Sequence, residues 1–322
     1  MTGPGGALLD VRDLVITFPA PAGERRVVAG IGYSLASGRT LGVVGESGCG
    51  KSVSALALLG LVPPPGRVTG SIRFAGRELI GQTPAEWRAL RGDRIAMVFQ
   101  EPMTALNPVM TVGEQIAEAI ILHQDQDRRA ARAQAVALLD QVGIAAPGDR
   151  ARAYPHQLSG GMRQRAMIAM ALACRPALLI ADEPTTALDV TIQAQIIELM
   201  QALQAEIGMA LQFISHNLAV VSEIADEIVV MYAGRIVERA PAEALFAAPL
   251  HPYTIGLIST LPDPERRVAR LPVIPGSVAS LSGQGCRFAD RCPRGDASCR
   301  RAEPPLEEIT PGHEAACFKI GK

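Results

Sequence analysis

The sequence predicts an α/β fold built around a phosphate-binding loop, and three neighbouring segments support this prediction. Residues 45–52 read GESGCGKS, which fits the pattern G-x-x-x-x-G-K-[ST]. The apolar run Thr40–Val44 before the motif is expected to be a buried strand, and Val53–Leu61 after it is expected to begin a helix. Strand, loop and helix in this order are the setting that the motif requires. A glycine-rich turn with an incidental Lys-Ser pair is the alternative interpretation.

The residue types in this loop suit a bound nucleotide phosphate. Gly45, Gly48 and Gly50 allow positive φ and a close approach of the backbone to a ligand. The loop amides and the positive end of the following helix form a nest for phosphate oxygens. The Lys51 ammonium suits the β- and γ-phosphates, and the Ser52 hydroxyl can hold Mg²⁺. The predicted nucleotide-binding residues here are Gly45, Glu46, Ser47, Gly48, Cys49, Gly50, Lys51, Ser52 and Val53.

Composition describes a globular chain with room for two domains, or for one large domain and an appendage. The chain has 322 residues, of which 48% are hydrophobic and 20% are charged. The net charge of −1 gives no sign of a nucleic-acid partner. Residues 1–6 show no signal-peptide pattern, and no run of about 18 apolar residues is present. We therefore expect a soluble cytoplasmic chain, which could still reach a membrane by docking on another subunit.

Strands are expected on both sides of the loop. Leu8–Phe18 and Val27–Leu35 show rough alternation and precede it, and Gly70–Phe74 follows it. Phe18 ends its strand, where an aromatic ring could stack on a nucleotide base. A core or edge phenylalanine is an equally good interpretation.

The middle of the chain reads as a strand followed by a mostly helical insert. Arg94–Gln100 is an apolar strand whose terminal amide, on Gln100, could reach a metal ion or a water, or could only cap the strand. Residues 101–108 contain two prolines and are expected to form a loop. Thr111–His123 and Arg128–Val142 have the apolar spacing of helices.

A second glycine-rich segment, LSGGM at residues 158–162, is expected to cap another helix. Ser159 is a good N-cap for a helix over Met162–Ala173. Gly160 and Gly161 leave bare amides beside the serine hydroxyl, which makes a second anion site by the same physics as the first. An ordinary capped helix is the alternative.

Two further strands end in polar side chains. The apolar run Ala177–Ala181 leads into Asp182 and Glu183, which would point in different directions, the first toward Mg²⁺ and the second toward an attacking water. A solvated acidic turn would not account for so apolar a strand. Ala210–Ser215 is followed by His216, at the sheet edge where ligands bind in open parallel sheets, although a lone histidine is more often structural. A hairpin is expected over residues 227–238.

The order of these motifs resembles the ATP-binding subunit of ABC transporters over roughly residues 8–250. The resemblance implies an ABC-type P-loop NTPase: a mixed RecA-like sheet, an antiparallel β subdomain and a helical subdomain at about 103–175. It implies domains at 1–250 and 251–322, the second a small cysteine-containing appendage. Met162 departs from the most widespread family form, which has Gln there, and this marks a subfamily.

The resemblance also implies a role for each matched residue. Phe18 would stack on adenine, and Lys51, Ser52 and Asp182 would bind phosphate and Mg²⁺. Gln100 would sense Mg²⁺ and water, Glu183 would act as general base, and His216 would contact the γ-phosphate. Ser159, Gly160 and Gly161 would complete the ATP site of a second, head-to-tail ATPase subunit.

Two stretches narrow the resemblance to the dipeptide/oligopeptide and nickel importers. They are EPMTALNPVMTVGEQI at residues 101–116, and the tail from HPYT at 251–254 to GCRFADRCP at 285–293. Such importers have two different ATPase subunits, two transmembrane permeases and an external solute-binding protein. The chain would then sit peripherally at the cytoplasmic face of the cell membrane.

Four of the six cysteines lie in the tail: Cys286, Cys292, Cys299 and Cys317. Four thiols in a reducing cytoplasm indicate metal or cluster ligation rather than disulfides, although disulfides or free thiols remain the alternative. Their spacing fits none of the familiar zinc patterns, because no C-x₂-C is present. Four thiolates suit either Zn²⁺ or a [4Fe–4S] cluster. Resemblance to tails of some peptide importers favours the cluster.

Other functions remain open at this point. The same machine could import nickel or another small solute. A soluble ABC ATPase of repair or translation usually has two ATPase units or long coiled-coil insertions, which this chain lacks. A non-enzymatic regulator would have a damaged Lys51, Asp182 or Glu183, and all three are intact.

Overall fold

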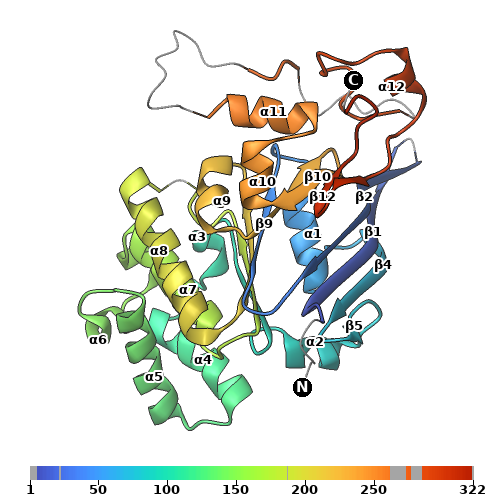
Figure 1. Cartoon of the computed structure of the whole chain (residues 1–322). Coiled ribbons are helices and arrows are strands. Elements are labelled where there is room, and N and C mark those ends of the chain that lie inside the picture. Colours follow the sequence, from blue (N-terminus) through green and yellow to red (C-terminus); the bar gives the residue numbers. More distant parts are fainter. Residues whose placement is uncertain (1–5, 22, 187, 262–272, 277–284, 321–322) are drawn as a thin grey trace. The chain divides into compact units, whose positions relative to one another are not determined.

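The computed structural model describes residues 6–21, 23–186, 188–261, 273–276 and 285–320. The chain divides into two compact units (Figure 1). The first contains residues 1–35, 40–80 and 213–322, and the second contains residues 36–39 and 81–212. The first unit is therefore assembled from both ends of the chain, whereas the second is almost continuous in sequence.

An antiparallel sheet in the order β2-β1-β4-β5 forms one part of the first unit. Its apolar positions alternate as predicted, and Leu14, Ile16, Ile31 and Ile72 are buried. The strands are β1 (Leu9–Ala20), β2 (Gly23–Leu35), β4 (Arg67–Phe74) and β5 (Arg77–Glu78).

A second run of strands in this unit carries the phosphate loop. β3 (Thr40–Val44) is buried throughout and pairs in parallel with β9 (Glu227–Tyr232). β9 pairs with β10 (Arg235–Pro241), β10 with β12 (His313–Ala315), and β12 with β11 (Glu307–Thr310), all antiparallel. The helices of the unit are α1 (Lys51–Leu58), α9 (Leu218–Ile224), α10 (Ala242–Ala247), α11 (Pro252–Ser259) and α12 (Ala297–Arg301).

The late strands β11 and β12 thus belong to the same sheet as β3, the strand that leads into the phosphate loop. The tail passes through α11 and α12 and returns to β10 (Figure 1). The buried Glu238 of β10 binds the tail, since its carboxylate contacts Nε2 of the buried His313 at 2.8 Å. The sequence indicated no strands here, because β11 and β12 are short and neither is apolar throughout.

The second unit pairs β6 (Ile95–Val98) in parallel with β7 (Leu178–Asp182). β8 (Ala210–Ser215) begins in this unit and ends in the first. The helices of the second unit are α2 (Pro84–Leu90), α3 (Pro102–Ala105), α4 (Val112–Gln124), α5 (Arg128–Gln141), α6 (Pro147–Arg150), α7 (Gly160–Leu172) and α8 (Val190–Ile207). A 3₁₀ turn lies at Pro155–Gln157.

The predicted helices of the insert are confirmed as α4 and α5. The expected loop at 101–108 was wrong in part, because Pro102 occupies the first position of the one-turn helix α3, where its fixed φ favours a helix. α7 begins at Gly160, two residues earlier than expected. Within the described ranges, no helix combines the length and the apolar character that a bilayer crossing requires.

Candidate nucleotide-binding site

The phosphate loop connects β3 to α1 and has the backbone that the glycines predict. Gly45, Gly48 and Gly50 have φ of 151°, 79° and 103°. A Cβ on Gly45 would lie 2.1 Å from the carbonyl oxygen of Met231 in β9, so only glycine fits at this close approach. The loop is tied to the β9–β10 turn by the Gly234 amide, which donates to the Cys49 carbonyl at 2.8 Å.

The Lys51 side chain folds back onto the phosphate loop and binds two of its carbonyl groups. Its Nζ donates to the Gly45 carbonyl at 2.7 Å and to the Glu46 carbonyl at 3.2 Å, and its side chain is buried. The buried Cys49 sulfur lies 3.9 Å from the same nitrogen, and burial raises the pKa of that thiol. A neutral thiol adds no negative charge, so the loop keeps a cation and amide donors suited to phosphate oxygens.

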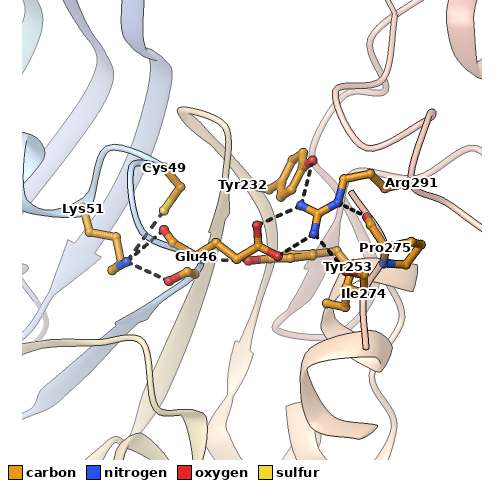
Figure 2. Close-up of polar contacts among 9 residues, drawn as sticks. Glu46, Cys49, Lys51, Tyr232, Tyr253, Ile274, Pro275 and Arg291 are labelled. Atoms are coloured by element: carbon orange, nitrogen blue, oxygen red, sulfur yellow. Dashed lines mark hydrogen bonds and ion pairs between the residues drawn. The ribbon is translucent and has the colours of Figure 1, made fainter. Parts of the chain in front are cut away.

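Glu46 connects the loop to the C-terminal part of the chain (Figure 2). Its amide donates to the Tyr253 hydroxyl at 2.8 Å, and its carboxylate binds both terminal nitrogens of Arg291 at 2.8 and 2.9 Å. Sequence analysis placed Glu46 in the site but missed Tyr253 and Arg291 as its partners. No sequence signal could pair residues 245 positions apart without an alignment.

The second unit brings together Gln100 and the two acids that end β7. Asp182 is buried, and Glu183 follows it with φ of 48°. Gln100 Nε2 and Thr186 Oγ1 both donate to Glu183 Oε2, at 3.1 and 3.0 Å. A left-handed backbone at a residue with a side chain is uncommon and is concentrated at functional sites. The structure therefore places Gln100 in direct contact with Glu183, and their roles as Mg²⁺ and water sensor and as general base stay predictions.

The predicted cap of α7 is confirmed in the same unit. The Ser159 side chain accepts a hydrogen bond from the Met162 amide at 3.4 Å, and Gly160 and Gly161 begin the helix. Ser159 and Gly160 are exposed, and a Cβ on Gly160 would meet no atom within 4 Å. The helix end is open to a ligand, and its role in anion binding stays a prediction.

Three further predicted residues are placed individually. Phe18 is half-buried opposite Arg25 of β2, and its ring lies against Gly66, where a Cβ would be 2.7 Å from the ring. His216 is exposed directly after β8, and Ser52 is half-buried in α1. Their roles in binding adenine, the γ-phosphate and Mg²⁺ stay predictions.

The four tail cysteines are all reduced. Cys299 is buried and its carbonyl accepts from the Cys286 amide at 2.7 Å. Burial, and then the charges of the other three thiols, raise the pKa of Cys286 to about 11. Across the described residues, no group of three or more His, Cys, Asp or Glu side chains is arranged to hold a metal ion. The described residues therefore do not support the expected iron–sulfur or zinc site.

Similarity to known proteins agrees with these sites. Residues 28–186 match the ABC transporter family, and residues 237–299 match the C-terminal region of oligopeptide/dipeptide transporters. "Probable peptide ABC transporter ATP-binding protein y4tR" of Sinorhizobium fredii (strain NBRC 101917 / NGR234) is 53% identical over 97% of this chain and 95% of its own length. The dipeptide transport ATP-binding protein DppD of Escherichia coli (strain K12) is 51% identical over 97% of this chain and 96% of its own.

Solved structures support the fold alone. The dimeric, post-hydrolysis ATP-binding cassette MJ0796, bound to ADP and phosphate, has a TM-score of 0.66 and 24% identity over 73% of this chain and 98% of its own. The sequence relatives match 97% of this chain, whereas this cassette matches 73% of it. The chain belongs to the ABC transporter family of ATP-binding subunits, in the group that carries the oligopeptide/dipeptide transporter C-terminal region.

Proposed function

We propose that this chain hydrolyses ATP to drive a membrane importer of dipeptides or oligopeptides. The observation that carries this proposal is an intact phosphate loop in a chain whose tail matches the C-terminal region of oligopeptide/dipeptide transporters. This chain matches 95% and 96% of the length of two relatives named for peptide and dipeptide transport. Nickel or another small solute is the alternative cargo.

The residues of the chain divide the work of hydrolysis. Lys51 and the loop amides hold the phosphates, and the oxygens of Ser52, Asp182 and Gln100 suit Mg²⁺, which prefers hard oxygen ligands. Bound Mg²⁺ would neutralise charge on the transferred phosphoryl group. Glu183 takes the proton of the attacking water, and the two donors on its Oε2 fix the carboxylate for that step. His216 donates to the γ-phosphate, and Phe18 stacks on adenine.

We propose that residues 1–250 form the ATP-binding domain, with a helical subdomain at about 103–175, and that residues 251–322 form the importer-type appendage. Ser159, Gly160 and Gly161 would complete the ATP site of a second, different ATPase subunit. ATP binding closes the pair and hydrolysis releases it. Two transmembrane permeases and an extracytoplasmic solute-binding protein complete the machine, which places the chain peripherally at the cytoplasmic face of the membrane.

A test of cargo uses the assembled machine. The chain is co-expressed with the permeases and second ATPase of its own operon, reconstituted in liposomes and supplied with the solute-binding protein. ATP-dependent uptake of a labelled dipeptide is expected, and Lys51→Ala should abolish it. Uptake of Ni²⁺ without dipeptide would favour the alternative cargo. Failure to copurify with permeases would favour a soluble ATPase, and absence of turnover would favour a regulator.

We also propose that the four tail cysteines hold a [4Fe–4S] cluster, with Zn²⁺ as the alternative. The chemistry of the donors supports this. The sulfur of Cys317 accepts the backbone amide of Lys319 at 3.4 Å, the kind of hydrogen bond that cluster thiolates receive. Anaerobically purified protein should absorb broadly in the visible range and contain about four irons per chain. Zinc would support the alternative, and no metal would leave four free thiols.

A further inference from the structure

Three contacts from the C-terminal part of the chain converge on Glu46, the second residue of the phosphate loop (Figure 2). Tyr253, in the first turn of α11, accepts from the Glu46 amide at 2.8 Å. Arg291, directly before Cys292, binds the Glu46 carboxylate with both terminal nitrogens, at 2.8 and 2.9 Å. The tail therefore binds both the backbone and the side chain of Glu46.

The guanidinium of Arg291 is fixed more firmly than a surface ion pair allows. It also donates to the Tyr232 hydroxyl at 3.2 Å and to the Pro275 carbonyl at 2.6 Å. Its carbon lies 5.6 Å from the ring centre of Tyr232 and 5.9 Å from that of Phe288. Its hydrogen bonds to Glu46 raise the pKa of Arg291, so the group stays cationic.

Burial distinguishes this ion pair from the exposed pair that Arg300 forms with Asp290 nearby. The Arg291 side chain is 8% exposed and Glu46 is 27% exposed. The neighbouring pair of Arg300 and Asp290 is 59% and 67% exposed, where ion pairs contribute little. Removing one member of a buried pair leaves the other charge uncompensated, so the Arg291 cation matters to Glu46 in a way that Arg300 does not matter to Asp290.

Glu46 also contacts Lys51 directly. Its carbonyl accepts from Lys51 Nζ at 3.2 Å, beside the Gly45 carbonyl at 2.7 Å. A chain of direct contacts therefore runs from Arg291 through Glu46 to the lysine that binds phosphate. The same carboxylate, without Arg291, would put a negative charge in a loop that must accept the polyanionic phosphates of ATP.

We propose that the C-terminal segment clamps the phosphate loop, with Arg291 and Tyr253 as positioning residues for nucleotide binding. Arg291 compensates the charge of Glu46, and together with Tyr253 it holds the loop in its phosphate-binding form. The tail is then part of the nucleotide site as well as a distinctive appendage of the subfamily. This inference rests on the proposed binding of ATP by the loop.

The test compares Arg291→Met with the double variant Glu46→Gln/Arg291→Met, and measures the Kd of a fluorescent ATP analogue on the full chain. Arg291→Met should raise the Kd about five- to tenfold, because Glu46 is left unpaired. The double variant should keep only a rise of about two- to threefold, because the repelling charge is gone while the bidentate contact with the loop stays lost. High salt should shrink the single-variant effect.

The control variants distinguish the effect of lost charge compensation at Glu46 from a nonspecific effect of the substitution on nucleotide binding. Asp290→Asn breaks the exposed pair beside Arg291 and should leave the Kd unchanged. A double variant as weak as the single one would show that Arg291 does not compensate the charge of Glu46, and that result would overturn the proposal. If Arg291→Met fails to fold, Arg291→Lys keeps the charge but loses the bidentate geometry and should raise the Kd about two- to threefold, whereas an unchanged Kd would overturn the proposal.

Two readouts keep this inference distinct from the proposed function. Absence of ATP binding by the wild-type chain would contradict the function itself, whereas normal binding by the wild type and by Arg291→Met would contradict only the clamp. In the assembled transporter, Arg291→Met should raise KM for ATP with kcat within about twofold, since Arg291 acts on binding rather than on proton transfer.

Discussion

At the residue scale, Glu183 has a backbone conformation that residues with side chains rarely adopt. Its φ of 48° turns the chain sharply after the buried Asp182. Such a conformation costs on the order of 1 to 3 kcal/mol and persists where neighbours enforce it. Gln100 and Thr186 do so by donating to the same carboxylate oxygen. The sequence predicted the acid pair and Gln100, but the turn that separates the two acids needed the structure.

Replacing the base tests its role directly. Glu183→Gln keeps the shape and the hydrogen-bonding side chain but cannot take a proton. We expect ATP to bind with near-normal Kd and steady phosphate release to fall at least about 100-fold, the usual contribution of a general base. Nucleotide binding and phosphate release are measured on the same preparation. Turnover near the wild-type rate would exclude Glu183 as the base.

A second residue predicts how stability depends on pH. His251 is buried, and its Nδ1 caps α11 by accepting from the Tyr253 amide at 3.0 Å. Burial lowers the pKa of His251 to about 4. Between pH 6.5 and 4 the unfolded chain therefore binds a proton that the folded protein does not, so acidification reduces the free energy of unfolding by up to about 3 kcal/mol.

His251→Asn should flatten that dependence, because asparagine can cap the helix but does not titrate in this range. Urea unfolding of the two proteins is compared at pH 7 and at pH 5. The variant should lose less stability on acidification than the wild type. Parallel losses in both proteins would show that His251 does not contribute to the pH dependence.

At the scale of elements, capped helices were predictable and short proline-initiated ones were not. Ser159 identified α7, and the apolar spacing of residues 111–142 identified α4 and α5. α3 was missed because Pro102 both breaks and begins helices, and only the local fold decides which. Strand β12 was missed because its pairing partner, β10, lies about 75 residues earlier, and β11 was missed because it pairs only with β12.

Charge at the start of α7 tests the second anion site. Ser159→Asp keeps a good N-cap and suits the helix dipole, so urea unfolding should show a stability within about 0.5 kcal/mol of the wild type. In the assembled transporter the new carboxylate should repel the γ-phosphate of the opposing site and reduce ATP turnover at least about tenfold. Ser159→Asn is the uncharged control, expected to keep both. Normal turnover of Ser159→Asp would leave this segment as an ordinary capped helix.

At the scale of the whole molecule, the first unit depends on contacts between residues far apart in the C-terminal third of the chain. The buried Glu238 carboxylate accepts from the amides of Leu250 and His251, at 2.7 and 2.8 Å, and contacts His313 Nε2 at 2.8 Å. The motifs could predict the nucleotide-binding residues because each lies in a short local pattern. They could not predict the structural roles of Glu238, His313 and Arg291, because these roles depend on contacts with residues far away in the sequence.

Loss of His313 should therefore destabilise the first unit. His313→Leu leaves the buried Glu238 with one hydrogen-bond partner fewer, and we expect the free energy of unfolding to fall by about 2 to 3 kcal/mol. His156→Leu, at an exposed histidine of the other unit, is the control and should change it by less than about 0.5 kcal/mol. Chemical denaturation measures both. Equal effects would show that the tail strand contributes no specific stability.

The discontinuity of the first unit has a consequence for the time at which it can be completed. Residues 81–212 of the second unit emerge from the ribosome as one nearly continuous stretch. Glu46, by contrast, is synthesised 245 residues before Arg291, a wait of about 12 to 50 s at usual rates of translation. Until then the phosphate loop exists without the residues that hold it. The phosphate loop is therefore synthesised early but gains its contact with Arg291 only late in translation. Chaperones that bind the growing chain would encounter a phosphate loop that lacks this contact.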